Sequence, residues 1–204
     1  MLTLYEDPIS GNCYKIRLVA AHLGIPLQRV KMDITKGVTR TSAFLALNPN
    51  GRVPLLQLEN GRTLSESHAI IWYLAEGSQL IPDDKFARAK VLQWMSFEQY
   101  NLEPNVATLR FLMAYKGQSK EDLGPVYDAK YKAGWEALSV LEQGLEGRDW
   151  LVGDAMTLAD IALYGYVHVA EEGPFSLADY ANIRSWCARI AARPGHIPID
   201  GLAR

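Results

Sequence analysis

Two side chains that could assist sulfur chemistry stand close together near the start of the chain. Ser10 is a hydroxyl donor in the loop between an expected strand and an expected helix, and Cys13 is a thiol at the start of that helix. A hydroxyl at the start of a helix can donate to a thiolate, and the helix dipole adds to the stabilisation. A cysteine in the first helical turn can itself have a lowered pKa and exchange disulfides. The loop therefore offers two kinds of thiol chemistry.

Two further motifs could recognise a short peptide. Val53 precedes Pro54, and a cis bond before proline, found in about 5–6% of such bonds, can turn the preceding amide and carbonyl outward in a tight turn. The backbone of Val53 could then pair with a peptide as a strand edge does. Glu66 and Ser67 stand where a helix is expected to begin, so free amides, the helix dipole and the Ser67 hydroxyl can hold a carboxylate, while Glu66 can accept from an ammonium.

The elements that position these motifs follow from the hydrophobic periodicity. Alternation over 2–5 predicts a strand, helical spacing over 13–23 predicts a helix that Gly24 ends, and 27–33 indicates a second strand. A strand, helix, strand unit implies a right-handed crossover and parallel strands.

A hairpin and a helix are predicted next. A strand over 53–58 is separated by Asn60-Gly61 from a strand that contains Thr63 and Leu64, and this dipeptide is a strong hairpin signal. The run Ser65-Glu66-Ser67 then opens a helix. The first part of the chain is therefore predicted to be a small α/β domain.

The second part of the chain is predicted to be helical. The segment 77–84, with Pro82-Asp83-Asp84 inside it, has the turn residues of a linker, and no strand pattern recurs beyond it. Pro104 should kink or begin a helix because it lacks an amide proton. Three apolar faces at helical spacing predict a bundle, namely Leu102, Val106, Leu109 and Met113; Tyr131, Trp135, Leu138, Leu141 and Leu145; and Ile183, Trp186, Cys187 and Ile190.

The bulk composition excludes several classes of protein. The chain has 204 residues, a net charge of −2 and interspersed charges, so it lacks the basic stripe of a nucleic-acid-binding protein. Cys13 and Cys187 match neither a disulfide framework nor metal-ligand spacing, which favours a reducing compartment and no metal. We expect no targeting segment and no bilayer span, hence no membrane partner and a cytoplasmic protein.

Four motifs resemble those of the soluble glutathione transferase family, and the resemblance runs nearly end to end. The run SGNCYKIR at 10–17 is similar to the catalytic loop of its serine and cysteine classes, and NPNGRVP at 48–54 is similar to the segment that ends in a cis-proline. ESHAI at 66–70 resembles the glutamate-serine motif, and TLADIA at 157–162 resembles the capping motif of the helical domain. The serine/cysteine-type bacterial and theta/zeta-like classes are the most similar.

The resemblance implies a fold and a co-substrate. The fold is an α/β thioredoxin-like N-terminal domain (βαβ-ββα) over 1–76, a linker over 77–85 and an all-α C-terminal helical bundle domain over 86–204. The co-substrate is glutathione, a short peptide with two carboxylates, an ammonium and a thiol. Its cysteinyl backbone would pair with Val53 beside Pro54, and its γ-glutamyl end would be held at Glu66 and Ser67. The glycyl carboxylate would be neutralised by Arg52 or Lys36.

Ser10 and Cys13 compete for the role of activating the thiol. A free thiol has a pKa of about 8.5, and lowering it by about two units needs roughly 2.7 kcal/mol. One charge-assisted hydrogen bond supplies on the order of 1.5–3 kcal/mol. Ser10 stands where the resemblance puts the catalytic serine, so we expect it to donate to the thiolate. Cys13 should face inward, one turn into the helix, and Tyr5, which matches the tyrosine of other classes, is expected to be structural.

The resemblance also implies a second substrate that binds between the two domains. Tyr100, Phe111 and Tyr115 are the candidates to line a pocket for a small hydrophobic electrophile, although aromatic residues at helical spacing are more often core. Thr157 and Asp160 are assigned to helix capping and not to chemistry.

Three functions remain open at this point. The first is conjugation of the glutathione thiolate to hydrophobic electrophiles, with the role in detoxification and the homodimer that the resemblance implies. The second is thiol-disulfide exchange that depends on Cys13. The third is a noncatalytic binding module on the same fold.

Overall fold

The chain divides into two compact units. The computed structural model describes residues 1–200. The first unit contains Met1–Ser78 together with the chain from Arg193, and the second contains Gln79–Ala192. The division after Ser78 lies inside the segment predicted as a linker. The return of residues 193–200 to the first unit was not expected, because the sequence analysis assigned the whole of 86–204 to the helical domain.

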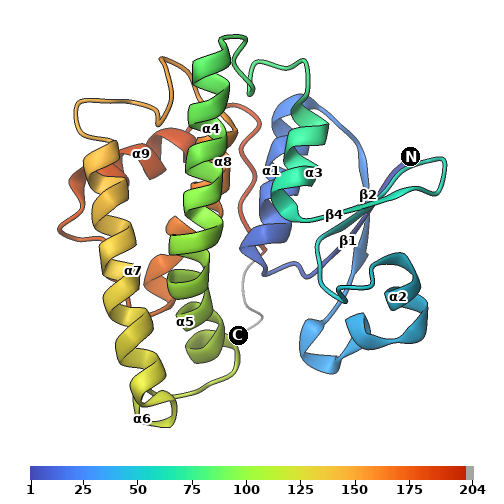
Figure 1. Cartoon of the computed structure of the whole chain (residues 1–204), viewed down its shortest axis with the longest axis horizontal. Coiled ribbons are helices and arrows are strands. Elements are labelled where there is room, and N and C mark those ends of the chain that lie inside the picture. The colour runs from blue at the N-terminus through green and yellow to red at the C-terminus, as the bar shows by residue number, and fades with distance from the viewer. Residues whose placement is uncertain (201–204) are drawn as a thin grey trace. The chain divides into compact units, whose positions relative to one another are not determined.

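A mixed four-stranded sheet forms the centre of the first unit. Its strands are β1 (Leu2–Glu6), β2 (Leu27–Lys31), β3 (Leu55–Gln57) and β4 (Thr63–Ser65), in the order β2-β1-β3-β4 (Figure 1). β1 is parallel to β2 and antiparallel to β3, and β3 is antiparallel to β4. The predicted parallel unit followed by an antiparallel hairpin is confirmed.

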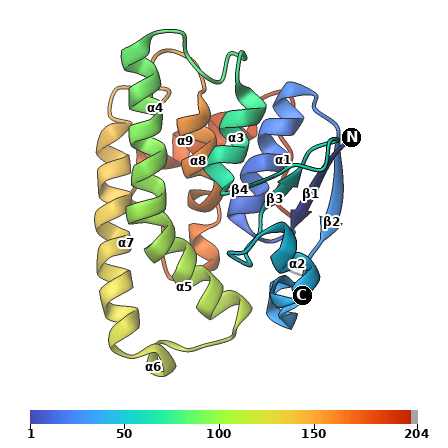
Figure 2. The same ribbon diagram turned by 45° about the vertical axis from the view of Figure 1, so that its right-hand side comes forward.

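Two helices pack side by side on one face of this sheet. They are α1 (Gly11–Leu23) and α3 (Ser67–Ala75), which are also in contact with each other (Figures 1 and 2). The core between helices and sheet is apolar and fully buried, with members such as Leu4, Ile16 and Ile70. Two short 3₁₀ turns, η1 (Ile34–Lys36) and η2 (Val38–Arg40), and the helix α2 (Ser42–Leu47) connect β2 to β3 and were not predicted.

Local chemistry sets the ends of these elements. α1 ends as predicted at Gly24, which has a φ of 65° and donates its amide to the Ala21 carbonyl at 3.3 Å. β2 ends at Lys31 and not at Asp33, because Asp33 caps η1 by accepting from the Thr35 amide at 3.0 Å. β3 begins at Leu55 and not at Val53, because Pro54 has no amide to give to a sheet ladder.

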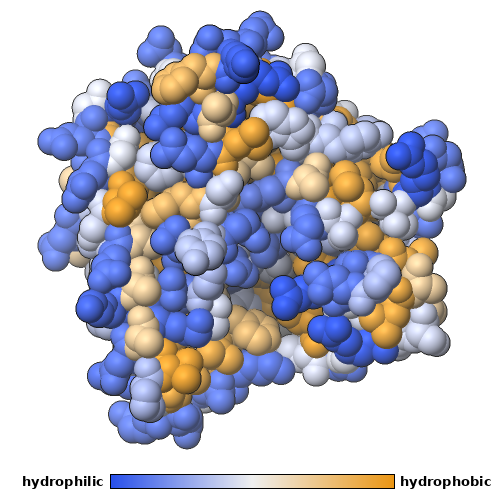
Figure 3. Space-filling model, viewed as in Figure 1, coloured by the Kyte–Doolittle hydropathy of each residue, from blue (hydrophilic) through white to orange (hydrophobic). Residues whose placement is uncertain are grey.

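The second unit is helical, as predicted. Its first part runs through α4 (Lys85–Phe97), η3 (Glu98–Ala107), α5 (Thr108–Arg110) and η4 (Phe111–Tyr115) without a loop between them. The rest comprises α6 (Lys120–Leu123), α7 (Pro125–Gly144), α8 (Leu158–Val167), the 3₁₀ turn η5 (Ala170–Glu172) and α9 (Ala181–Ala191). Figure 3 shows hydrophilic residues over most of the face of this unit that is turned to the viewer.

Most residues of the predicted apolar faces are buried in the core of this unit. Leu102, Leu138 and Ile183 are fully buried. Four other residues predicted to belong to these faces are only partly buried, namely Met113, Tyr131, Trp135 and Cys187.

Pro104 lies inside a helical stretch and does not begin one. It sits in η3, whose turns have the wide π-helical hydrogen-bond pattern. Proline cannot donate the bond from residue i to residue i−4 of an α-helix, and a wider turn is one way for the chain to continue past it. The Pro104 carbonyl accepts from Lys130 Nζ at 2.7 Å.

The capping motif of α8 is present as predicted. Thr157 accepts from the Ala159 amide at 3.3 Å, and the buried Asp160 carboxylate returns to the Thr157 amide at 2.8 Å. Asp160 also accepts from the Leu151 amide at 3.0 Å and from Trp186 Nε1 at 2.9 Å. One carboxylate therefore joins the start of α8 to a loop and to α9.

Candidate functional site

The loop that carries Ser10 is fixed at both ends by hydrogen bonds. Ser10 donates its amide to the Asp7 carbonyl at 3.1 Å, and its own carbonyl accepts from the Tyr14 amide at 2.9 Å. The buried Asp7 carboxylate accepts from the amides of Ile9 and Ile34, each at 3.2 Å. Ser10 caps α1, since its hydroxyl oxygen accepts from the Cys13 amide at 3.4 Å. The half-buried hydroxyl keeps a proton that it can donate.

Cys13 is in a different environment from Ser10. Its side chain is fully buried. Burial raises the pKa of the Cys13 thiol to about 12, and contacts with the Ser10 side chain and the Asp7 backbone lower it by less. A thiol with such a pKa is neutral near pH 7, and it is the thiolate that attacks a disulfide. The inward orientation expected for Cys13 is confirmed, and its environment disfavours disulfide exchange.

The second motif forms a tight turn before β3. The Val53–Pro54 bond is cis, as the resemblance implied. The buried Asn48 side chain holds the turn, donating to the Arg52 carbonyl at 2.8 Å and accepting from the Asn50 amide at 3.1 Å. Gly51 has a φ of 61°, and a Cβ there would come within 2.6 Å of Arg40 Nη1. Glycine is therefore required at this position of the turn.

The start of α3 lies where a helix was predicted to begin, and its backbone is unusual. Glu66 is not helical and has a φ of 70°, in the left-handed region that residues other than glycine seldom adopt. The helix begins at Ser67, and its N-cap residue Glu66 makes no side-chain cap hydrogen bond. Asn50 Nδ2 donates to Glu66 Oε1 at 3.5 Å. Unusual backbone of this kind gathers at ligand sites, and uncapped amides at a helix start suit an anion.

A buried polar cluster joins the starts of α1 and α3. Asn12 Oδ1 accepts from Lys15 Nζ at 2.8 Å and from the Ser67 hydroxyl at 3.1 Å. The Lys15 side chain is fully buried, and its Nζ lies 3.4 Å from His68 Nε2. The loop of Ser10 and the motif of Glu66 are thus connected through side chains. Sequence reasoning missed Asn12 and Lys15, although both stand inside a quoted motif.

The two predicted cationic residues lie on the surface of the first unit. Lys36 Nζ pairs with the Asp33 carboxylate at 3.1 Å, and the Lys36 side chain is 75% exposed. Arg52 is also exposed, and it directly precedes the residues of the cis bond. Both roles therefore remain predictions.

The aromatic residues predicted for an electrophile pocket have different surroundings. Tyr100 is 84% exposed on η3, whereas the rings of Phe111 and Tyr115 stack with centroids 6.1 Å apart. The Tyr115 hydroxyl donates to Glu172 Oε2 at 3.4 Å, and the same carboxylate oxygen pairs with Arg110 Nη2 at 2.6 Å. Burial is the largest cause that raises the pKa of Tyr115, to about 12. Tyr115 is therefore a neutral hydroxyl near pH 7.

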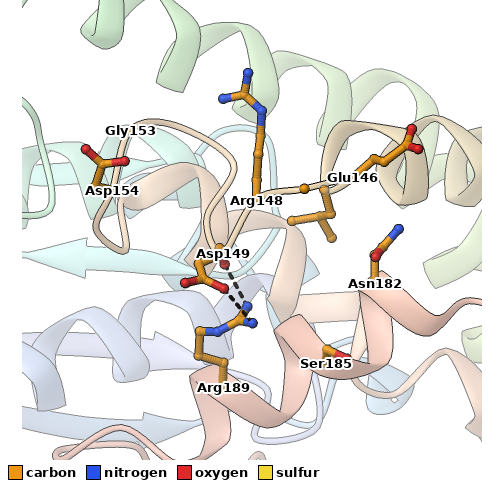
Figure 4. Close-up of a pocket in the computed structure, with 10 residues that line it drawn as sticks. Glu146, Arg148, Asp149, Gly153, Asp154, Asn182, Ser185 and Arg189 are labelled. Carbon is orange, nitrogen blue, oxygen red and sulfur yellow. Dashed lines mark hydrogen bonds and ion pairs between the residues drawn. The ribbon is translucent and has the colours of Figure 1, made fainter.

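The second unit contains hollows lined by residues that sequence reasoning did not select. One, of about 820 Å³, lies beside the loop after α7 and is lined by polar and charged residues (Figure 4). Asp149 and Arg189 are paired there at 2.8 Å, and Arg148 extends away from this pair. The acidic Glu146 and Asp154 line the same hollow, so its charges largely cancel. The residues that line this hollow include no cysteine and no histidine.

The described residues form neither a metal-binding cluster nor a membrane-spanning helix. Within residues 1–200, no three His, Cys, Asp or Glu side chains are grouped closely enough to hold a metal ion. The helices of the same stretch include none with the length and apolar character that a membrane crossing needs.

Comparisons with known proteins agree along the chain. Residues 9–76 match the family described as glutathione S-transferase, N-terminal domain, and residues 105–194 match glutathione S-transferase, C-terminal domain. The chain is 31% identical over 204 residues to glutathione S-transferase 3 of Zea mays, and the alignment covers 95% of this chain and 90% of that protein.

Solved structures give the same result. A glutathione S-transferase from Pseudomonas fluorescens Pf-5 has 46% identity and a TM-score of 0.94, with 97% of this chain and 98% of that chain covered. A glutathione transferase from Burkholderia graminis, solved with two glutathione molecules bound per subunit, has 32% identity and a TM-score of 0.83. That match covers 95% of this chain and 85% of the other.

Proposed function

The chain belongs to the glutathione S-transferase family and is a glutathione transferase, and we propose that it conjugates glutathione to hydrophobic electrophiles with Ser10 stabilising the thiolate. The observation that carries this proposal is the position of the Ser10 hydroxyl at the start of α1. The Ser10 hydroxyl oxygen accepts from the Cys13 amide, so its proton can be donated to a thiolate that lies at the start of the helix. The thiol proton passes to solvent, and the thiolate sulfur then forms a thioether with the electrophilic carbon as the bond from that carbon to its leaving group breaks.

The γ-glutamyl end of glutathione is assigned to the start of α3. The amides there, which the Glu66 side chain does not cap, would hold its carboxylate, and the Glu66 carboxylate would accept from its ammonium. The Ser67 hydroxyl donates to Asn12, so Ser67 would bind the carboxylate through its backbone amide. The Lys15 cation, one hydrogen bond behind Asn12, favours an anion at this end.

The rest of glutathione is assigned to the cis turn and to the surface. The Val53 backbone, beside Pro54, would pair with the cysteinyl backbone of glutathione, and the cis bond observed there supports this assignment. Arg52 or Lys36 would neutralise the glycyl carboxylate. Because Lys36 is already paired with Asp33, Arg52 is the better candidate.

The electrophile is proposed to contact Phe111 and Tyr115 in preference to Tyr100. Phe111 and Tyr115 form a partly buried aromatic surface with a neutral hydroxyl at its edge. The Tyr100 side chain is almost fully exposed in the single chain. It is therefore a better candidate for a contact with another protein molecule than for a residue that lines a pocket.

We also propose that the protein is a cytoplasmic homodimer. Phe86 is 74% exposed and Leu92 is 48% exposed on α4, and together with Tyr100 of η3 they place large apolar side chains on the outside of this helical stretch. Such a face suits a partner surface. Both cysteines are free thiols, in keeping with a reducing compartment.

The two alternative functions have less support. Disulfide exchange needs an accessible thiolate, whereas Cys13 is fully buried with a raised thiol pKa. A noncatalytic module would not need Ser10, the cis turn and the uncapped start of α3 in a single unit.

The proposed function is tested by removing the Ser10 hydroxyl. Ser10→Ala should lower turnover of a generic aromatic electrophile at pH 7 by about tenfold or more, with glutathione affinity little changed. Thr41→Ala is a matched control, because Thr41 caps α2 through the same kind of bond, 3.4 Å from its hydroxyl to the Phe44 amide. Each variant should lose about 1 kcal/mol of stability. Equal turnover in the two variants would remove Ser10 from the mechanism.

A further inference from the structure

One buried guanidinium holds together three segments around the proposed thiol-activating loop. Arg17 lies on α1 with its side chain 3% exposed. Its Nη2 donates to the Pro8 carbonyl at 2.6 Å, within the loop that leads to Ser10. Its Nε lies 3.0 Å from Oε2 of Glu6, and its Nη1 lies 3.0 Å from Oδ2 of Asp200. Arg17 therefore links the end of β1, the loop and the C-terminal segment.

The C-terminal segment reaches α1 at a second point. The buried Tyr14 hydroxyl donates to the Ile197 carbonyl at 2.7 Å and lies 3.2 Å from His196 Nε2. The segment turns toward α1 at Gly195, which has a φ of 82° and where a Cβ would meet His22 Nδ1 at 3.3 Å. Residues 193–200 thus form a strap across the first unit, one that contacts the same helix that Ser10 caps.

The charges around Arg17 are balanced only when the strap is in place. Arg29 on β2 shares both carboxylates with Arg17, pairing with Glu6 and, at 2.6 Å, with Asp200. Two carboxylates thus face two guanidinium groups. Without Asp200, the fully buried Glu6 would face both cations alone. Buried pairs of this kind contribute little net stability, but the rigid fork of arginine fixes the geometry of its partners.

The position of the Pro8 carbonyl matters because Ser10 follows two residues later. A donor stabilises a thiolate only within hydrogen-bond distance and direction, and a small displacement of a catalytic group can cost much of its effect. We propose that Arg17, completed by Asp200 of the strap, is a positioning residue that sets the loop so that the Ser10 hydroxyl meets the sulfur of glutathione. This inference rests on the proposed role of Ser10.

The chain offers a matched pair of variants. Arg17→Lys keeps the positive charge, but a lysine ammonium cannot contact all three partners of the arginine. Arg29→Gln removes the other cation that pairs with the same two carboxylates. Among residues 1–200, the hydrogen bonds and ion pairs of Arg29 go to Glu6 and Asp200, and none goes to the loop over 7–10. Arg17→Lys should raise the pKa of bound glutathione by about half a unit or more and lower kcat about three- to tenfold, with a smaller change in KM. Arg29→Gln should leave both quantities near the wild-type values.

Asp200→Asn gives a second test if Arg17→Lys does not fold. The Asp200 side chain is 39% exposed, so its replacement by an amide of the same shape should leave the unit folded. We expect the thiol pKa and kcat to change in the same direction as in Arg17→Lys, by less. Unchanged values in a folded Arg17→Lys or Asp200→Asn protein, or an equal effect of Arg29→Gln, would overturn the inference. A wild-type bound thiol near its free pKa that Ser10→Ala does not alter would instead refute the proposed function.

Discussion

At the scale of single residues, Ser10 and Cys13 have opposite environments although they share the start of α1. Ser10 is half-buried and caps the helix, and Cys13 is sealed in the core. The difference arises because Ser10 is the N-cap residue, with extended backbone outside the helix, whereas Cys13 lies inside the first turn and faces the core. A hydroxyl needs no ionisation to donate, whereas the Cys13 thiol would have to lose a proton in an apolar environment.

Cys13→Ala should therefore leave conjugation nearly intact. With a thiol pKa of about 12, Cys13 stays neutral in the working range and contributes packing only. We expect turnover within about twofold of the wild type and a loss of about 1 kcal/mol in the free energy of unfolding. Steady-state kinetics and urea unfolding check the two values. Loss of turnover in a folded variant would restore Cys13 as the reactive group.

The sequence nominates candidate site residues but not the interactions between them. Ser10, Val53, Pro54, Glu66 and Ser67 could be selected because each stands inside a local motif. The contacts that join these motifs are not local.

The cluster around Asn12 illustrates this limit. Asn12 meets Ser67 across 55 positions of the chain, and a buried lysine such as Lys15 has no signature of its own in an amphipathic helix. The left-handed backbone of Glu66 is equally hidden, since positive φ is normally predicted from glycine.

At the scale of elements, helix starts serve two purposes in this protein. The start of α8 is closed by its own capping box, whereas Glu66, the N-cap residue of α3, makes no side-chain cap bond. The first arrangement stabilises the fold, and the second is the one to which we assign the γ-glutamyl carboxylate.

Asp160→Ala should be strongly destabilising without affecting the chemistry. The carboxylate accepts from the Thr157 amide and hydroxyl, the Leu151 amide and Trp186 Nε1, and the substitution leaves these buried donors without a partner. We expect a loss of about 3 kcal/mol or more by urea unfolding, against about 1 kcal/mol for Thr157→Ala. The folded fraction should retain the thiol pKa of the wild type. A wild-type unfolding midpoint in Asp160→Ala would show that the cap is dispensable.

The elements were predictable where the pattern is local and repeated. Gly24 ends α1 through its own backbone, and Ser10 caps the start of α1 through its side-chain oxygen, so both ends depend on local residues. The wide turns around Pro104 were not predictable, since a proline can kink, begin or widen a helix and the neighbours decide which. The short α2 carries too few residues to show a periodicity.

At the scale of the whole molecule, the two units are not two consecutive stretches of the chain. The helical sequence ends with α9, and the described residues that follow it belong to the first unit. The composition of residues 193–200 does not predict this return to the first unit, because the contacts that hold the strap come from Tyr14 and Arg17, which are distant in sequence. The fold class could be predicted from the order of elements, but this return of the chain could not.

The strap should make the stability of the first unit depend on pH. Burial is the largest cause that lowers the pKa of His22, with the Arg193 and His196 charges acting in the same direction, and burial also lowers the pKa of His196. As the pH falls through 6.5, the unfolded histidine binds a proton while the folded one stays neutral. The free energy of unfolding therefore decreases as the pH falls through this range, and it levels off below the pKa of His22 in the folded protein.

Urea unfolding at a series of pH values between about 5 and 7 checks this expectation. His22→Asn should flatten the dependence, since the amide does not titrate. A variant with the same slope as the wild type would assign the dependence to other groups.

The central claim is that Ser10 lowers the pKa of the glutathione thiol, and ultraviolet titration of the bound thiolate tests it most directly. The wild-type complex should titrate well below the free value of about 8.5, and Ser10→Ala should return the midpoint toward that value by about one to two units. Thr41→Ala, which loses a comparable cap, should titrate like the wild type. The same midpoint in the wild type and in Ser10→Ala would contradict the account.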